Sequence, residues 1–182
     1  STTTYISPTV LLGTSANVLW DTGTLSKNVI QSVDLADGRI VFQSGKTRGN
    51  AVIGLFDKRN ECIWSWHIWS ADYDPATSAQ TYSSGAVFMD RNLGALTADC
   101  TQPAARGLYY QWGRKDPFPY PATCQEIVKR ADAVDADGFA YAVSNPRDSW
   151  ENPYGVMTVE WSIAHPTTYM KSALFQEWVE WA

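Results

Sequence analysis

Five short apolar runs separated by turn residues fill the first 70 residues of the chain, and this spacing limits the possible folds more than any other feature of the sequence. Strands that recur about every 8 to 12 residues are typical of a β-sandwich rather than of alternating strands and helices. Asp37-Gly38 lies between two of the runs and predicts a tight hairpin. The runs are Ala16–Trp20, Val29–Val33, Arg39–Phe42, Ala51–Phe56 and Cys62–Trp69.

The fifth run is apolar on both faces of its predicted strand. Because side chains alternate along a strand, Cys62, Trp64, Trp66 and Ile68 are predicted on one face and Ile63, Ser65, His67 and Trp69 on the other. A strand with two apolar faces is expected to be covered on both sides. We therefore expect the sandwich core against one face and a second domain against the other.

The loop Asp72-Tyr-Asp-Pro75 is the predicted domain boundary. It separates a β-sandwich domain, residues 1–73, from a second domain, residues 74–182, so that the predicted class is mainly β with an α+β second part. Within the second domain, Pro103–Trp112 is predicted to be helical and Met157–Ile163 to be a strand. Asp72 and Asp74 are expected to cap a turn rather than to bind a cation.

Composition excludes several classes of function. A net charge of −5 leaves no basic excess to neutralise phosphates, so no nucleic-acid partner is predicted. No apolar run approaches the roughly 20 residues of a membrane helix, so no transmembrane segment is predicted. GxSxG, HExxH, P-loop and GxGxxG motifs are all missing from the sequence. The sequence therefore predicts a protein that is not an enzyme and needs no cofactor.

The three cysteines, Cys62, Cys100 and Cys124, do not form a metal-binding pattern. There is no CxxC pair, and His67 and His165 are distant from any cysteine pair in sequence, so no metal site is predicted. Cys100 and Cys124 lie in polar, proline-bearing sequence, where either a disulfide or two thiols would fit. Cys62 opens an apolar run and is predicted to be a buried thiol.

Two groups of charged residues are predicted to tie loops together rather than to catalyse a reaction. Asp90-Arg91-Asn92 follows an apolar run and precedes a glycine turn, and Arg114-Lys115-Asp116 follows Trp112-Gly113. Ser65 and His67 would lie two residues apart on one strand face, but nothing nearby supplies an oriented base or an oxyanion hole. His67 is therefore expected to be a core histidine.

Aromatic residues are abundant in the second half of the chain, with Trp 9 and Tyr 9 in the whole sequence. Most are expected to form the core of a domain that has little regular structure. A few exposed ones would suit the recognition of carbohydrate or protein, because their flat apolar faces stack and their polar tips donate hydrogen bonds. The candidate binding residues are Tyr120, Trp150, Tyr154 and Trp161.

Four segments in order carry a family resemblance: Asn50-Ala-Val-Ile53, Ile63-Trp-Ser-Trp-His-Ile-Trp69, Met89-Asp-Arg-Asn-Leu-Gly-Ala95 and Gly107-Leu-Tyr-Tyr-Gln-Trp-Gly-Arg-Lys-Asp-Pro-Phe118. They closely resemble the surface and fimbrillin-like proteins of gut Bacteroidales that carry a Fibrobacter-succinogenes-type major paralogous domain. The resemblance implies an immunoglobulin-like β-sandwich followed by a C-type lectin-like domain. Asp90, Arg91, Asn92, Trp112, Arg114 and Asp116 belong to its motifs.

The resemblance also implies an extracellular, surface-exposed adhesin or fimbrial subunit, whose partners would be other pilus or surface-protein subunits and host glycans or proteins. Alternatives are a surface lipoprotein that binds glycans or proteins outside a filament, a phage receptor-binding protein, and an enzyme of the formylglycine-generating kind with Cys100 and Cys124 in a cleft. Family members continue into a Cys-Pro-x-Gly-Trp-Arg-Val-Pro segment that does not occur here. The second domain is therefore expected to be incomplete at its C-terminus.

Overall fold

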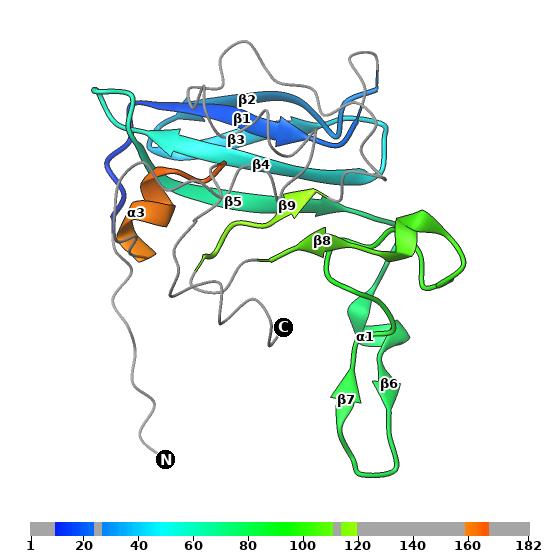
Figure 1. Cartoon of the computed structure of the whole chain (residues 1–182). Helices are drawn as coiled ribbons and strands as arrows, with labels where there is room; N and C mark the ends of the chain where they lie inside the picture. The colour runs from blue at the N-terminus through cyan, green and yellow to red at the C-terminus, as the bar shows by residue number, and fades with distance from the viewer. Residues whose placement is uncertain (1–9, 24–26, 111–113, 120–158, 168–182) are drawn as a thin grey trace.

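The computed structural model describes residues 10–23, 27–110, 114–119 and 159–167, and this part of the chain is mainly β (Figure 1). Its larger strands are β1 (Ser15–Asp21), β2 (Ile30–Ala36), β3 (Arg39–Ser44), β4 (Gly49–Phe56) and β5 (Cys62–Ser70). Its smaller elements are α1 (Pro75–Ser78), β6 (Gln80–Thr81), β7 (Val87–Phe88), a 3₁₀ turn (Pro103–Ala105), β8 (Leu108–Tyr109), β9 (Phe118–Pro119) and α3 (Val159–Ala164). All five strands predicted in the first 70 residues are confirmed.

Two antiparallel units are built from these five strands. β1, β4 and β5 form a three-stranded sheet in the order β1-β4-β5, and β2 and β3 form a separate hairpin. The predicted turn at Asp37-Gly38 connects the hairpin, and both residues have positive φ, 51° and 71°. Positive φ at both central positions is what a two-residue hairpin turn requires, which explains why Asp-Gly occurs there.

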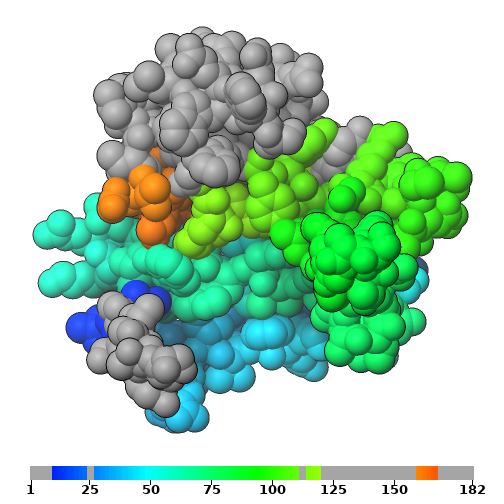
Figure 2. Space-filling view, turned by 90° about the horizontal axis from the view of Figure 1, so that it is seen from below, coloured from blue at the N-terminus to red at the C-terminus, as the bar shows by residue number. Residues whose placement is uncertain are grey.

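The sheet β1-β4-β5 is the middle layer of the fold. Its central strand, β4, is buried at all eight residues. One of its faces packs towards the β2–β3 hairpin, in a cluster of Val18, Val29, Ile30, Ala51 and Ile53 with Val33, Ile40 and Ile68 against it. The opposite face packs in a second cluster, of Leu19, Trp20, Val52, Phe56 and Cys62 with Leu108 against it. Figure 2 shows the layers in order, with β2–β3 on one side of β5 and β8, β9 and α3 on the other.

The structure corrects the predicted position of Cys62. We predicted it on the same face as Trp66 and Ile68, but it packs with Val52 in the opposite cluster. The cause is a β-bulge: Leu55 pairs with Trp64, whereas Phe56 pairs with Cys62, so that one residue of β5 is skipped. One extra residue in a strand moves all side chains beyond it to the other face. Cys62 is nevertheless a buried thiol, as predicted.

Two predictions for the second half are wrong. Pro103–Trp112 is not a helix: a 3₁₀ turn ends at Ala105, and Leu108–Tyr109 then form β8, which pairs with β9. Gly107 lies between them with φ +72°, a conformation that cannot continue a helix. The predicted strand from Met157 to Ile163 is also wrong, because Val159–Ala164 form the helix α3.

A short helix and then a hairpin follow β5. Asp74 accepts a hydrogen bond from the Ala76 N–H at 2.9 Å and so caps α1, as expected for a turn-capping aspartate. β6 and β7 then pair as a short antiparallel hairpin. In Figure 1 this hairpin projects away from the layered strands.

A buried carboxylate connects the end of β1 to the start of β2. Asp21 is only 1% exposed. Its Oδ1 accepts from the backbone N–H groups of Gly23 at 2.7 Å and Val29 at 3.1 Å, and its Oδ2 accepts from Ile30 at 2.9 Å. Three donors on one buried side chain fix the entry of β2 over the sheet.

Asp21→Asn is therefore expected to lower the free energy of unfolding by about 1–3 kcal/mol, because the NH2 that replaces one carboxylate oxygen cannot accept from a buried N–H. The measurement is urea denaturation followed by tryptophan fluorescence. Asp34→Asn is the matched control, since Asp34 is exposed and accepts from its neighbour Leu35. Equal stability of the two variants would contradict the assigned role.

Candidate functional site

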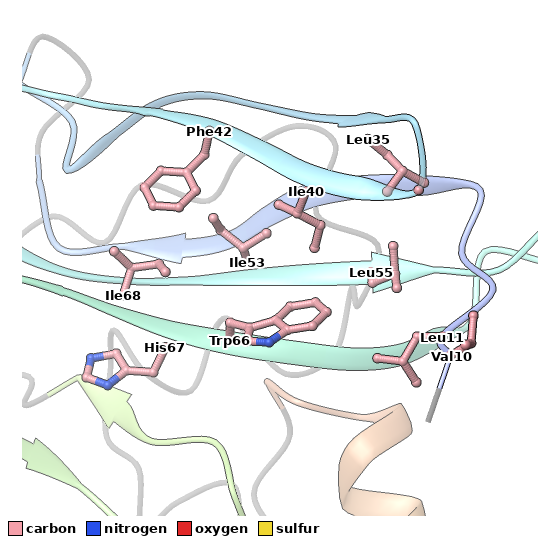
Figure 3. Close-up of a pocket in the computed structure, with 11 residues that line it drawn as sticks. Val10, Leu11, Leu35, Ile40, Phe42, Ile53, Leu55, Trp66, His67 and Ile68 are labelled. Carbon is pink, nitrogen blue, oxygen red and sulfur yellow. The ribbon is translucent and has the colours of Figure 1, made fainter. Parts of the chain in front are cut away.

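The candidate site is an apolar groove between the β2–β3 hairpin and the β4–β5 part of the sheet (Figure 3). Its volume is about 520 Å³, within the usual range for binding pockets. Phe42 and Ile40 point from β3 towards Ile53 of β4 (Figure 3). The apolar lining residues are Val10, Leu11, Leu35, Ile40, Phe42, Ile53, Leu55, Trp66 and Ile68.

The groove is open to the surface along its aromatic side chains. Phe42 is 41% exposed and Trp66 is 38% exposed, although both lie on strands that face the interior between the two sheets. β3 pairs with β2, and no other strand of the described ranges lies on its second edge. The groove therefore combines exposed aromatic surface with an unpaired strand edge, the two features that an added extended segment uses.

None of the described residues that line the groove is Asp, Glu, Lys or Arg. His67 borders the groove from β5, but its ring points to the opposite face of the sheet, where it lies 6.4 Å from the ring centre of Trp20 (Figure 3). Burial lowers the pKa of His67 to about 4, and the Asp116 carboxylate opposes this shift only in part. The Asn50 amide fixes the ring: its Nδ2 donates to the Gly94 carbonyl at 2.9 Å, and its Oδ1 lies 3.0 Å from His67 Nε2. His67 Nε2 must therefore be the donor, and His67 is a partnered core histidine, as expected.

A cluster of polar side chains joins β5 to the segment before β9. Ser65 donates to Asp116 Oδ1 at 2.5 Å, and the Lys115 ammonium contacts that same oxygen at 2.8 Å. Lys115 also donates to the Ser65 carbonyl at 2.9 Å and to the Ser65 hydroxyl, and it lies 4.7 Å from the ring centre of Trp64. A serine–lysine pair acts as nucleophile and base only with a neutral lysine and an accessible hydroxyl. Here Lys115 is ion-paired and Ser65 is 4% exposed, so the cluster is a structural joint.

The Asp90-Arg91 pair has the loop-tying geometry expected from its sequence. Two hydrogen bonds, at 2.8 and 3.0 Å, join Arg91 to Asp90, and the guanidinium lies 4.1 Å from the ring centre of Tyr73. The Tyr73 ring in turn lies 5.3 Å from that of Trp69 at the end of β5. Arg91 holds the pKa of the Asp90 carboxyl below its usual value. The pair thus anchors the loop after β7 against the chain that leaves β5.

Asn92 and Gly94 complete the same loop. The Asn92 side chain donates to the Ala105 and Arg106 carbonyls at 3.3 and 3.4 Å, which closes the loop over the 3₁₀ turn. Gly94 has φ +81°, and its carbonyl accepts a hydrogen bond from the side-chain amide of Asn50 on β4. The Asp-Arg-Asn-Leu-Gly motif therefore fastens this loop to the sheet face opposite the groove.

Arg114 makes the corresponding connection to α3. Its Nη2 donates to the carbonyls of His165 at 3.1 Å and Pro166 at 2.5 Å, and its guanidinium lies 4.6 Å from the ring centre of Phe118. Arg114 is buried, with 8% of the residue exposed. Trp112, the other member predicted for this motif, lies outside the described residues.

Of the four predicted aromatic binding residues, the structure describes only Trp161. Trp161 lies on α3, is half-buried, and stacks on His165 with ring centres 4.0 Å apart. Tyr120, Trp150 and Tyr154 lie outside the described residues. The groove was not predicted from the sequence. A signal for it exists, because Leu35 pairs with Ile40, and Ile40 and Phe42 are two residues apart on β3, which gives the hairpin one apolar face.

The cysteine predictions stay partly open. Cys100 is exposed, and Cys124 lies outside the described residues, so their pairing stays a prediction. Within the described ranges, no group of three or more His, Cys, Asp or Glu side chains is arranged to hold a metal ion.

Comparisons with protein-family models, curated proteins and solved structures give no match to this chain. Among the residues that the structure describes, no helix has the length and apolar character to cross a membrane.

Gly94→Ala is expected to destabilise the fold more than Gly85→Ala. Both glycines have nearly the same φ, +81° and +82°, so both substitutions carry a similar backbone strain. A Cβ at Gly94 would lie 2.4 Å from Leu108 Cγ, whereas a Cβ at Gly85 meets nothing within 4 Å. The difference should be about 1–3 kcal/mol, the usual cost of overpacking. Thermal unfolding of the two variants measures it, and equal melting temperatures would refute the close packing at Gly94.

The free energy of unfolding is expected to decrease when the solution is acidified, because of His67. Its pKa is about 4 in the folded chain against 6.5 for an unperturbed histidine, so the folded state favours the neutral ring. The contribution is complete above pH 6.5 and is lost as the pH falls towards 4, by an amount on the order of 3 kcal/mol. The test is the free energy of unfolding against pH for wild type and His67→Gln. Carboxylates titrate in both proteins, so parallel curves would contradict this assignment.

Proposed function

We propose that this chain is a non-enzymatic subunit of an extracellular, surface-attached assembly, a fimbrial or adhesin subunit of a Bacteroidales bacterium. The proposal is carried by the open apolar groove beside the edge of β3 that pairs with no described strand. Such a groove suits an extended apolar segment of a neighbouring subunit, because main-chain hydrogen bonds to the edge supply affinity and pockets for alternate side chains supply specificity. Other surface-protein subunits are the proposed partners.

The motif resemblance supports the finer assignment of the fold. We propose an immunoglobulin-like sandwich over residues 1–73 and a C-type lectin-like domain over residues 74–182. Two packed sheets in the first part and short strands joined by long loops in the second are consistent with this assignment. The first part would then serve assembly, and the second would serve recognition of host glycans or proteins.

The groove gives a direct test in native cells. Phe42→Glu places a charge in the groove and is expected to remove the chain from sheared filaments, since burying an unpaired carboxylate is costly. Val41→Glu is the matched control: Val41 is adjacent, is 55% exposed, and does not line the groove. Mass spectrometry of sheared and outer-membrane fractions would report the chain in each.

Wild type and Val41→Glu should be recovered in the sheared fraction, and Phe42→Glu should not. Recovery of wild type in the membrane fraction alone would instead support the surface lipoprotein that binds glycans or proteins outside a filament. Recovery of Phe42→Glu in sheared filaments at the wild-type level would contradict assembly through the groove.

A further inference from the structure

The β6–β7 hairpin exposes three large apolar side chains. Tyr82 is 57% exposed, Val87 is 62% exposed and Phe88 is 60% exposed. The rings of Tyr82 and Phe88 lie edge to face, with centres 5.5 Å apart at 87°, so each supports the other's orientation. Neither side chain belongs to one of the two buried clusters. The hairpin therefore exposes an ordered pair of aromatic rings at the surface.

The shape of the hairpin suits a concave partner. The backbone is closed by hydrogen bonds from Tyr82 N–H to the Ala86 carbonyl and from Gly85 N–H to the Tyr82 carbonyl, both at 2.9 Å. Figure 1 shows it extending beyond the layered strands. Projecting loops bind by insertion into hollows, where aromatic side chains supply most of the affinity.

The charge distribution narrows the choice of partner. Residues 75–89 contain no Asp, Glu, Lys, Arg or His, in a chain whose net charge is −5. The described residues that line the groove likewise include no Asp, Glu, Lys or Arg. Two copies of an acidic chain repel each other across most of their surfaces, but a contact between these two regions brings no fixed charges together and desolvates none.

The projecting hairpin and the groove are thus both apolar and both without charged side chains among the described residues, and they belong to different parts of one chain. We propose that the β6–β7 hairpin of one copy inserts Tyr82 and Phe88 into the groove of a second copy, beside Phe42 and Trp66. This inference rests on the proposed role of the groove in assembly and names the segment that enters it. Because hairpin and groove are different surfaces, the contact is heterologous and leaves one free hairpin and one free groove at the ends of every assembly that does not close into a ring.

Two variants of the full chain test the inference by complementation. The hairpin variant carries Tyr82→Ser and Phe88→Ser, and the groove variant carries Phe42→Glu. All three residues are exposed, so both variants should fold, which circular dichroism and thermal unfolding check. Sedimentation velocity over a range of concentrations measures assembly, and Val41→Glu controls for an added charge on β3.

Wild type and Val41→Glu are expected to form assemblies larger than dimers as concentration rises. Each of the other variants alone should associate at least about tenfold more weakly, because each lacks one half of the contact. An equimolar mixture of the two should form dimers and stop there. The intact hairpin of the groove variant can enter the intact groove of the hairpin variant, and neither has a second working surface.

Other outcomes would overturn the inference. A mixture that stays monomeric, or a hairpin variant that assembles like wild type, excludes the hairpin as the inserted segment. If the groove variant fails to assemble while the hairpin variant assembles like wild type, the proposed function stands and only this inference fails. If both variants assemble like wild type, the inference and the proposed function are both refuted. A wild type that stays monomeric, but binds neutral mucin glycans in a manner lost with the hairpin variant, would make the hairpin a saccharide-binding element instead.

Discussion

The burial of β4 on both faces is the constraint on which the rest of the structure depends. A strand with all eight residues buried needs a cover on each side, and the chain supplies two different covers. The β2–β3 hairpin packs on one face through apolar side chains, and the loops around β8 pack on the other. Apolar burial is the main favourable contribution to folding, so neither half of the described chain has a complete core without this shared strand.

The two covers are attached by different kinds of interaction. On the face towards β8, polar side chains reach across: Asn50 to Gly94, Ser65 to Asp116, and Arg91 onto Tyr73. Directional contacts of this kind fix one arrangement and leave little freedom to open. The β2–β3 hairpin is held by apolar packing and by the Asp21 carboxylate at one end. The less tightly fastened side is the one that contains the groove.

Much of the first part could be predicted from sequence, since alternation and turn residues are local signals. The five strands and the Asp37-Gly38 turn follow from them. Cys62 was placed on the wrong face because a bulge depends on pairing with β4, which the strand's own sequence does not encode. Val159, Trp161 and Ile163 alternate as in a strand, yet the segment is helical and Trp161 stacks on His165, four residues along. The groove was not predictable, because a local pattern identifies an apolar face but not what covers it.

The shared strand also has a consequence for how the chain opens. Main-chain amides exchange with solvent through openings whose free energy ranges from near zero to that of global unfolding. β4 is paired with β1 and β5 on its two edges and covered on both faces, so its amides should exchange only through global unfolding. The hairpin between Gln80 and Phe88, outside both clusters, should exchange its amides fast without disturbing either core. Sequence change in that hairpin is then nearly free of cost to folding, so selection can alter the contact surface while the scaffold beneath it stays the same.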